Sequence, residues 1–295
     1  MMLARSWAGL VLSLALAACS TPAATLIPAP TITAPASAGA GSPATRTPAA
    51  RQTPTAVAQP PIPTAPVPLR PGIEILVVPL VVAGVEAGET LVIARIEPAR
   101  VDVRVRYAPK TPRPVQAWLA DEAADIVINA GYFTQDNLAT GLLIADGVVT
   151  GQTYRGFGGL FAVRAGPPAT LGLQWLKEQP YVADRKITQA VESFPMLVRK
   201  GKVVDGINDD GRRNRRSFIA LDRSGRLLLG VSRYAALTLT DLAAALAGQP
   251  ALAIDAALNL DGGASSGLGI RAPADALAID SFDEVPAVIT VTGKK

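Results

Sequence analysis

From about residue 71 onward the chain consists of short apolar segments, most of them too short to be helices. Apolar and polar residues alternate strictly over Val101–Tyr107, which predicts a strand with one solvent-exposed face. Runs rich in Val, Ile and Leu predict further, buried strands at Ile73–Val82 (interrupted at Pro79), Thr90–Ile96, Asp125–Ile128, Leu160–Val163 and Leu171–Leu176.

Short turns join several of these segments. Within Gly141–Val149 the pair Asp146-Gly147 favours a type I′ hairpin turn. Two further hairpins are predicted, one around Arg199-Lys-Gly201 and one around Asp222-Arg-Ser-Gly225. Short turns connect antiparallel strands, so we expect largely antiparallel pairing.

Two segments have helical character. Val115–Ala124 has one apolar and one polar side. Thr240–Ala247 is bounded by an N-cap candidate, Thr240, and by Gly248 with Pro250 beyond it. The predicted fold is α+β: largely antiparallel or mixed β-sheets with a few packed helices, in one globular domain without internal repeats.

The N-terminus predicts export. A basic residue, Arg5, precedes the apolar run Trp7–Ala18, which is shorter than the roughly 20 residues of a spanning helix. Leu16-Ala-Ala-Cys19 resembles the lipobox of bacterial lipoproteins. We therefore expect residues 1–18 to be a lipoprotein signal peptide and Cys19 to carry a lipid that anchors the protein to the membrane. The alternative is a soluble secreted protein whose signal happens to contain a cysteine.

Residues 19–70 predict a disordered tether. Twelve of the 25 prolines fall within residues 20–70, which contain no acidic residue. Such a segment buries too little apolar surface to fold and favours an extended chain. The alternative is an inert tail. The globular domain is then residues 71–295, on an exported, membrane-anchored lipoprotein of a bacterial cell envelope.

Composition excludes several classes of function. The chain has no histidine, and Cys19 is its one cysteine, so His-based triads, ordinary zinc sites and disulfides are excluded. The net charge of +4 and an aromatic content of 5% do not suggest a nucleic-acid partner. Catalysis must rest on carboxylates, which suits glycoside hydrolysis. The oligomeric state stays open.

Two loops have the chemistry of a carbohydrate site. Asn259-Leu-Asp-Gly-Gly-Ala-Ser-Ser266 combines an amide, a carboxylate, two glycines and two hydroxyls. Ile128-Asn-Ala-Gly-Tyr-Phe133 follows the same pattern. Asp261 is the leading carboxylate and Asn129 the corresponding amide. The alternative is that both side chains merely cap turns.

The basic run Arg212–Arg216 is either a solvated loop or part of a binding site for the substrate. In the second interpretation Arg216 and Ser217, at the start of a strand, face inward and the guanidinium binds phosphate. Asp209 and Asp210 are a weak signal for a hard cation. The sequence thus indicates no cofactor and no metal ligand, and a divalent cation remains an open alternative. The aromatic residues near these motifs stack on sugar or belong to the core: Tyr132, Phe133, Tyr154 and Trp175.

Five segments occur in the order seen in the phosphodiester glycosidase family: Asn129–Phe133, Gly141–Gly147, Pro195–Val203, Arg216–Asp222 and Asn259–Ser266. The chain resembles this family over roughly Val101–Val291. The resemblance implies hydrolysis of a sugar-1-phosphodiester, with Asp261 as catalytic carboxylate and Arg216 as phosphate clamp. It also implies a pocket that contains Asn129, Gly131, Asn259, Gly262, Gly263 and Ser265, in which glycine N–H groups bind hydroxyls or phosphate oxygens.

The chain departs from the family pattern at two places. It reads Glu192-Ser-Phe-Pro195 where Gln-Ala-Gly-Pro or Gln-Ser-Gly-Pro is usual, and Ala264 replaces a common third glycine. The departure at Glu192 and Phe194 then supplies a second acid/base group, or it blocks the pocket and alters specificity. The function expected is an exported hydrolase of glycosyl phosphodiesters in envelope or scavenged glycans. The alternatives are a non-catalytic envelope module that binds phosphorylated glycans and a purely structural lipoprotein.

Overall fold

The computed structural model describes residues 65–154 and 156–294. The predicted signal peptide, Cys19 and most of the predicted tether lie outside the described residues. None of the helices in the described ranges has the length and apolar character needed to cross a bilayer.

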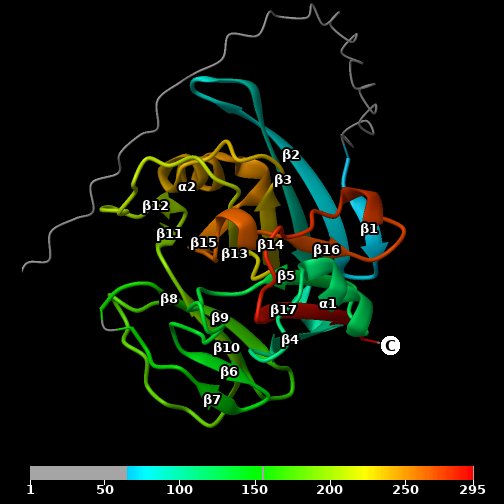
Figure 1. Ribbon diagram of the computed structural model, residues 1–295, viewed down its shortest axis with the longest axis vertical. Coiled ribbons are helices and arrows are strands. Elements are labelled where there is room, and N and C mark those ends of the chain that lie inside the picture. The colour runs from blue at the N-terminus through cyan, green and yellow to red at the C-terminus, as the bar shows by residue number, and fades with distance from the viewer. Residues whose placement is uncertain (1–64, 155, 295) are drawn as a thin grey trace, which may run out of the picture. The chain divides into compact units, whose positions relative to one another are not determined.

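The largest layer is an eight-stranded sheet with strand order β1-β2-β3-β14-β13-β15-β11-β12, in which all neighbours are antiparallel (Figure 1). Its strands are β1 (Val67–Arg70), β2 (Ile73–Val82), β3 (Val85–Ile96), β11 (Met196–Arg199), β12 (Lys202–Val203), β13 (Ser217–Asp222), β14 (Leu227–Ser232) and β15 (Ile254–Asn259). Strand β1 lies within the predicted tether, so the sheet begins before residue 71.

Two smaller antiparallel sheets complete the β framework. A five-stranded sheet has the order β7-β6-β10-β8-β9, built from β6 (Leu143–Ala145), β7 (Val148–Thr150), β8 (Gly159–Arg164), β9 (Thr170–Trp175) and β10 (Ile187–Ser193). A four-stranded sheet has the order β16-β5-β17-β4, built from β4 (Val101–Tyr107), β5 (Ile126–Asn129), β16 (Leu268–Ile270) and β17 (Ala287–Gly293).

The main hydrophobic core is shared by all three sheets. Ile75 of β2, Ile128 of β5 and Phe161 of β8 are completely buried in one cluster. Burying each such side chain stabilises the fold by about 1.5–3 kcal/mol. Smaller hydrophobic clusters lie on the opposite faces of the sheets. Each sheet is therefore packed on both faces, against the main core on one side and against a smaller cluster on the other.

Two α-helices provide part of this cover in the described residues. Helix α1 (Val115–Asp121) packs on β5 and β16, and helix α2 (Leu239–Gly248) packs on β11 and β15 (Figure 1). Single 3-10 turns occupy Pro98–Arg100, Pro250–Leu252, Gly263–Ser265 and Asp275–Leu277.

Several local predictions are confirmed and others need correction. The type I′ turn is confirmed, because Asp146 and Gly147 both have positive φ (48° and 81°). Strand β2 is not interrupted at Pro79, which stays in register with Thr90. The N-cap of α2 is Thr238 and not Thr240: Thr238 and Asp241 form a reciprocal capping box. The chain is mainly β, with fewer helical residues than an α+β fold suggests.

Candidate functional site

The candidate site lies where corners from all three sheets meet. One corner follows β5 at Asn129, a second follows β10 at Phe194, and a third follows β15 at Asp261. A fourth precedes β13 at Arg216. The sequence-predicted residues are thereby brought together from segments up to 132 residues apart.

Hydrogen bonds join the first and third corners directly. The amide nitrogen of the Asn129 side chain donates to the main-chain carbonyl of Asp261 at 2.8 Å. In the reverse direction, the Asp261 N–H donates to the carbonyl of Ala130 at 3.1 Å. The Asn129 side-chain oxygen accepts from Gly267 N–H at 3.2 Å. Asn129 is 1% exposed. Its contacts make it a residue that positions the Asp261 loop.

Asn259 connects the third corner to the first and second corners. Its side-chain nitrogen donates to the hydroxyl of Tyr132 at 2.8 Å and to the carbonyl of Phe194 at 2.9 Å. Its main-chain N–H donates to the carbonyl of Pro195 at 3.0 Å. Asn259 is fully buried, and within the described part of the chain its side-chain oxygen has no hydrogen-bond partner.

Glycine is required at two of these corners. A Cβ on Gly131 would lie 2.5 Å from the carbonyl oxygen of Glu192, so two loops approach too closely for any other residue. Gly263 has φ of +65°, which L-residues avoid. The N–H groups of Gly262 and Gly263 are already engaged, since Gly262 donates to the Asp261 carboxylate and Gly263 to the carbonyl of Arg215. They are therefore not the free donors that the sequence led us to expect.

Asp261 carries a carboxylate with unusual acid–base properties. Burial raises its pKa to about 6, although hydrogen bonds from the Ser265 hydroxyl and the Gly262 N–H oppose this. The residue keeps some contact with solvent. A carboxyl group that titrates near pH 6 in a partly closed site is suited to proton transfer at neutral pH.

Arg216 is the buried cation of the site. Its residue is 7% exposed, and its Nε and Nη2 donate to the carbonyls of Leu237 (3.0 Å) and Arg212 (2.7 Å). Two of the acidic residues whose charges act on Arg216 pair with other arginines: Asp210 with Arg212, and Asp241 of α2 with Arg213. Arg216 Nη1 faces Gly262, because a Cβ there would lie 3.7 Å from it. A buried guanidinium held by neutral carbonyls retains its charge for an anion.

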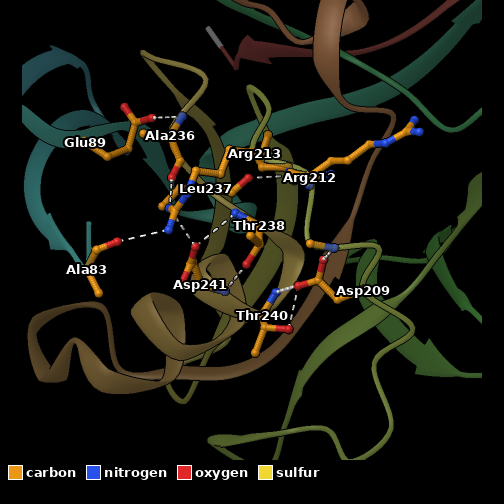
Figure 2. A network of polar contacts seen from close by, with 12 residues as sticks. Ala83, Glu89, Asp209, Arg212, Arg213, Ala236, Leu237, Thr238, Thr240 and Asp241 are labelled. Carbon is orange, nitrogen blue, oxygen red and sulfur yellow. Dashed lines mark hydrogen bonds and ion pairs between the residues drawn. The ribbon is translucent and has the colours of Figure 1, made fainter. Parts of the chain in front are cut away.

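A network of polar contacts joins the segments that contain Arg212 and Leu237, whose carbonyls bind Arg216 (Figure 2). Arg213 donates to the carbonyls of Ala236 (2.6 Å) and Ala83 (3.0 Å) and forms an ion pair with Asp241. Asp209 accepts from the main-chain N–H and hydroxyl of Thr240 at 2.7 and 2.6 Å. Although burial opposes the shift, these hydrogen bonds lower the pKa of Asp209 to about 2.

The basic run therefore divides into two parts. Arg212, with 80% of its side chain exposed, and Arg213 belong to a surface loop, whereas Arg215 and Arg216 are buried. Asp209 and Asp210 serve as loop and helix contacts. In the described ranges no group of three or more acidic or cysteine residues is arranged to hold a metal ion.

Tyr132 has a role that the sequence analysis missed, because there it was considered as an aromatic ring alone. Its hydroxyl accepts from Asn259, which leaves the phenolic proton for another acceptor. Burial and the negative charge of Asp261 raise the pKa of Tyr132, while the charge of Arg216 lowers it. The phenol is therefore a neutral donor near both the carboxylate and the cation.

Glu192 and Ser217 lie near these corners. The Glu192 carboxylate is fully engaged, whereas the buried Ser217 hydroxyl has no hydrogen-bond partner within the described residues. The Glu192 carboxylate accepts from the main-chain N–H groups of Leu142 (2.9 Å) and Tyr154 (2.8 Å) and from the Thr153 hydroxyl (3.1 Å). Burial raises the pKa of Glu192. Ser217 is completely buried on β13, where strand alternation places it on the same face as the core residue Ile219.

A cavity of about 430 Å³ opens beside the site. Tyr132 forms part of its wall, together with Phe157, Trp175 and Phe194. The Tyr132 and Phe194 rings stack with centroids 4.4 Å apart. The site thus has a polar end with a carboxylate and a cation, and an adjoining aromatic cavity.

Solved structures of similar fold include the following two proteins. The catalytic domain of zebrafish N-acetylglucosamine-1-phosphodiester alpha-N-acetylglucosaminidase is 17% identical, with a TM-score of 0.58 over 76% of this chain and 85% of that one. A protein from Synechocystis is 16% identical, with a TM-score of 0.53 over 76% of this chain and 62% of that one. At such identities the likeness concerns the fold. A search of curated proteins finds no significant match.

The family comparison is more specific. The family model for phosphodiester glycosidases matches residues 122–292, more than half of the chain. The matched region contains every corner that meets at the site, from Asn129 to Asp261. The order of the sequence motifs, the shared fold and this match agree, and the chain belongs to the phosphodiester glycosidase family.

Proposed function

We propose that the protein is an exported hydrolase that cleaves a glycosyl (sugar-1) phosphodiester bond. The observation that carries the proposal is that a carboxylate, Asp261, and a buried cation, Arg216, lie near each other. Arg216 Nη1 faces Gly262, the residue after Asp261, and both charges act on the Tyr132 phenol. A sugar-1-phosphodiester needs both charges. Its phosphate is an anion, and its anomeric carbon becomes positively charged in the transition state.

In the proposed reaction Arg216 binds the phosphate oxygens and Tyr132 donates a hydrogen bond next to them. Water attacks the anomeric carbon while the bond from that carbon to the bridging oxygen breaks. The bonding electron pair leaves with the phosphate monoester. A phosphate monoester has a second pKa near 6, so its departure needs little help from a general acid.

Asp261 acts in its ionised form. It faces the positive charge that develops at the anomeric carbon and takes the proton lost by the attacking water. With a pKa of about 6 it is ionised at neutral pH and still basic enough to accept that proton. The engaged carboxylate of Glu192 supports the loop that contains Tyr154 and takes no part in proton transfer.

We place the substrate outside the cytoplasm, among envelope or scavenged glycans, on the basis of the predicted signal peptide and the lipidation site at Cys19. The first sugar to test is N-acetylglucosamine in α linkage, because the zebrafish relative is named for that bond. The purified full-length chain, incubated with α-N-acetylglucosamine-1-phosphate methyl diester, should release free N-acetylglucosamine.

Asp261→Asn provides the decisive comparison. The variant should lose at least about 10³-fold in kcat yet bind the diester with a similar Kd, because the amide keeps the shape of the carboxylate without its charge. Thr153→Ala, outside the reacting groups, should retain measurable turnover. Absence of sugar release by the wild-type chain from all sugar-1-phosphodiesters tested would refute the hydrolase.

One observation favours a second candidate function. With Glu192 occupied by three hydrogen bonds, Asp261 is left without its predicted acid/base partner. A non-catalytic module that binds phosphorylated glycans would need the cation and the amides and no acid/base pair. For such a module, wild type and Asp261→Asn would both bind the diester, and neither would release sugar.

A further inference from the structure

The cavity beside the site concentrates the aromatic residues of the chain. The chain has 3 Trp, 5 Tyr and 6 Phe residues. Four of them, Tyr132, Phe157, Trp175 and Phe194, line this cavity, and Tyr154 stacks on Phe157 with centroids 4.7 Å apart. Phe157 is 49% exposed at the rim. Large apolar rings left open to solvent at one place mark a binding surface.

The rest of the wall is also poor in polar groups. Aliphatic side chains of Val204, Ile207 and Leu239 continue it away from the polar end of the site. Besides the Tyr132 hydroxyl, the polar side chains in the lining are Lys177, Asp205 and Asn208, and the Lys177 ammonium lies 5.5 Å from the Trp175 ring centre.

Such a wall is unfavourable for a second sugar. A sugar carries a hydroxyl on nearly every ring carbon, and each buried hydroxyl without a partner costs about 1–3 kcal/mol. A hydrocarbon gains free energy in the same surroundings, because its apolar surface leaves water. The lining therefore selects for an apolar occupant.

The cavity is connected to the position of the phosphate through Tyr132. The hydroxyl of Tyr132 accepts a hydrogen bond from Asn259, and its pKa responds to the charges of Asp261 and Arg216. The ring of Tyr132 stacks on Phe194 in the cavity wall. On the other side, Leu239 of the wall follows two residues after Leu237, whose carbonyl holds Arg216. A phosphate bound by Arg216 would direct its second ester group into the cavity.

We propose that this cavity binds an apolar group esterified to the phosphate, so that the preferred substrates are sugar-1-phosphodiesters of hydrocarbon alcohols. The inference rests on the proposed function and adds the chemical class of the alcohol esterified to the departing phosphate. A volume of about 430 Å³ accommodates a drug-sized group. Phe194 forms part of the wall where the family pattern has glycine. We therefore expect the apolar preference in this chain and not in family members that keep the glycine.

The test is a series of α-N-acetylglucosamine-1-phosphodiesters of methyl, butyl, octyl, benzyl and glyceryl alcohols with the full-length chain. We expect kcat/KM to rise about fourfold per methylene from methyl to butyl. The glyceryl diester, similar in size to butyl but hydroxylated, should react no faster than the methyl diester. Comparing kcat/KM of the benzyl and octyl diesters shows whether the cavity prefers an aromatic ring or an alkyl group.

Two variants locate the effect. Phe157→Ser and Ile207→Ser should each lower the octyl-to-methyl ratio of kcat/KM about tenfold, and Phe157→Leu should restore most of it. Val182→Ser is the matched control, because Val182 is 77% exposed outside the cavity, and the ratio should stay as in the wild type. An unchanged ratio in both cavity variants would place the apolar preference elsewhere and overturn the inference.

A binding measurement separates failure of this inference from failure of the proposed function. Methyl phosphate and octyl phosphate are added to the protein, and the Tm is recorded. Rates that are flat along the series, or fastest for glyceryl, overturn the apolar preference and leave the hydrolase intact. If no diester is cleaved but octyl phosphate raises Tm more than methyl phosphate, the hydrolase is wrong and the apolar cavity stands. No cleavage and no Tm difference overturn both.

Discussion

The side-chain amide of Asn129 holds the main-chain carbonyl of Asp261 at 2.8 Å, and Asp261 in return donates its N–H to Ala130. The two loops with the strongest carbohydrate pattern are thus one unit. The side chain of Asn129 therefore fixes the position of the loop that contains Asp261.

Asn129→Ala tests this brace. The partly buried carbonyl of Asp261 would lose its donor, at a cost of about 1–3 kcal/mol. We expect Tm to fall by several degrees and kcat to fall about 10- to 100-fold, because the carboxylate is no longer held. Calorimetry and initial rates measure the two effects. Gln116→Ala on α1 is the control, and an equal loss of kcat there would show that the effect is general destabilisation.

The pKa of Asp261 predicts the pH dependence of activity. In the proposed reaction the ionised carboxylate is the active form, so kcat/KM should fall about tenfold per pH unit below pH 6 and level off above it. The measurement is the pH profile of sugar release from a diester, whose own phosphate does not titrate in this range. A profile that is flat between pH 4.5 and 7 would exclude Asp261 as the ionising group.

The same pKa predicts a pH-dependent change in stability. The folded-state pKa of about 6 lies above the ordinary value of 3.8, so the folded protein holds this proton more tightly than the unfolded chain. That contribution is present in full below pH 4 and is lost as pH rises through 6. Asp261→Asn should therefore raise the free energy of unfolding at pH 8 by about 2 kcal/mol relative to its effect at pH 4. Thermal melts at the two pH values measure this.

Arg216 is predicted to bind the phosphate through its planar guanidinium. Arg216→Lys keeps the charge but loses the fork of donors, so kcat/KM should fall about 10- to 100-fold and inhibition by inorganic phosphate should weaken in parallel. Arg212→Lys changes a side chain that is 80% exposed and should stay within about twofold of wild type. Equal effects of the two substitutions would indicate a diffuse basic surface.

Glu192 is predicted to support the fold. Glu192→Gln would place an amide N–H against the N–H of Leu142 or Tyr154 and cost about 1–3 kcal/mol of stability. The acid limb of the pH–rate profile should remain near pH 6. A shift of that limb in the variant would identify Glu192 as an acid/base group, contrary to its contacts.

Tyr132→Phe removes one hydroxyl and leaves the ring that stacks on Phe194. The Asn259 amide loses an acceptor and the bound phosphate loses a donor, so kcat should fall about 10- to 100-fold. The preference among alkyl diesters should persist because the aromatic wall remains. A kcat equal to wild type would show that the phenol proton takes no part.

Much of the fold follows from local sequence. The strand at Val101–Tyr107 was predictable from its alternation and several others from apolar runs, and the hairpins from turns such as Asp146-Gly147. The N-cap of α2 was misplaced because two threonines compete for it, and the capping box with Asp241 decides for Thr238. The continuity of β2 through Pro79 depends on pairing with Thr90, which local sequence does not show.

The site was predictable in composition and less so in geometry. The two loops of Asn129 and Asp261 were recognisable from their residue types and from the family resemblance. Which arginine of the basic run is buried depends on the carbonyls of Leu237 and Arg212, which no pattern reveals. Likewise, the partners that occupy Glu192 lie about 40 and 50 residues away along the chain.

The meeting of three separate sheets at one place has a consequence for how the protein loses activity. Each sheet supplies a corner, so partial melting of any one of them would dismantle the reacting groups before the others unfold. Catalysis should then disappear at or below the lowest temperature at which any layer opens, and the thermal inactivation curve would report the weakest layer rather than the average of the three.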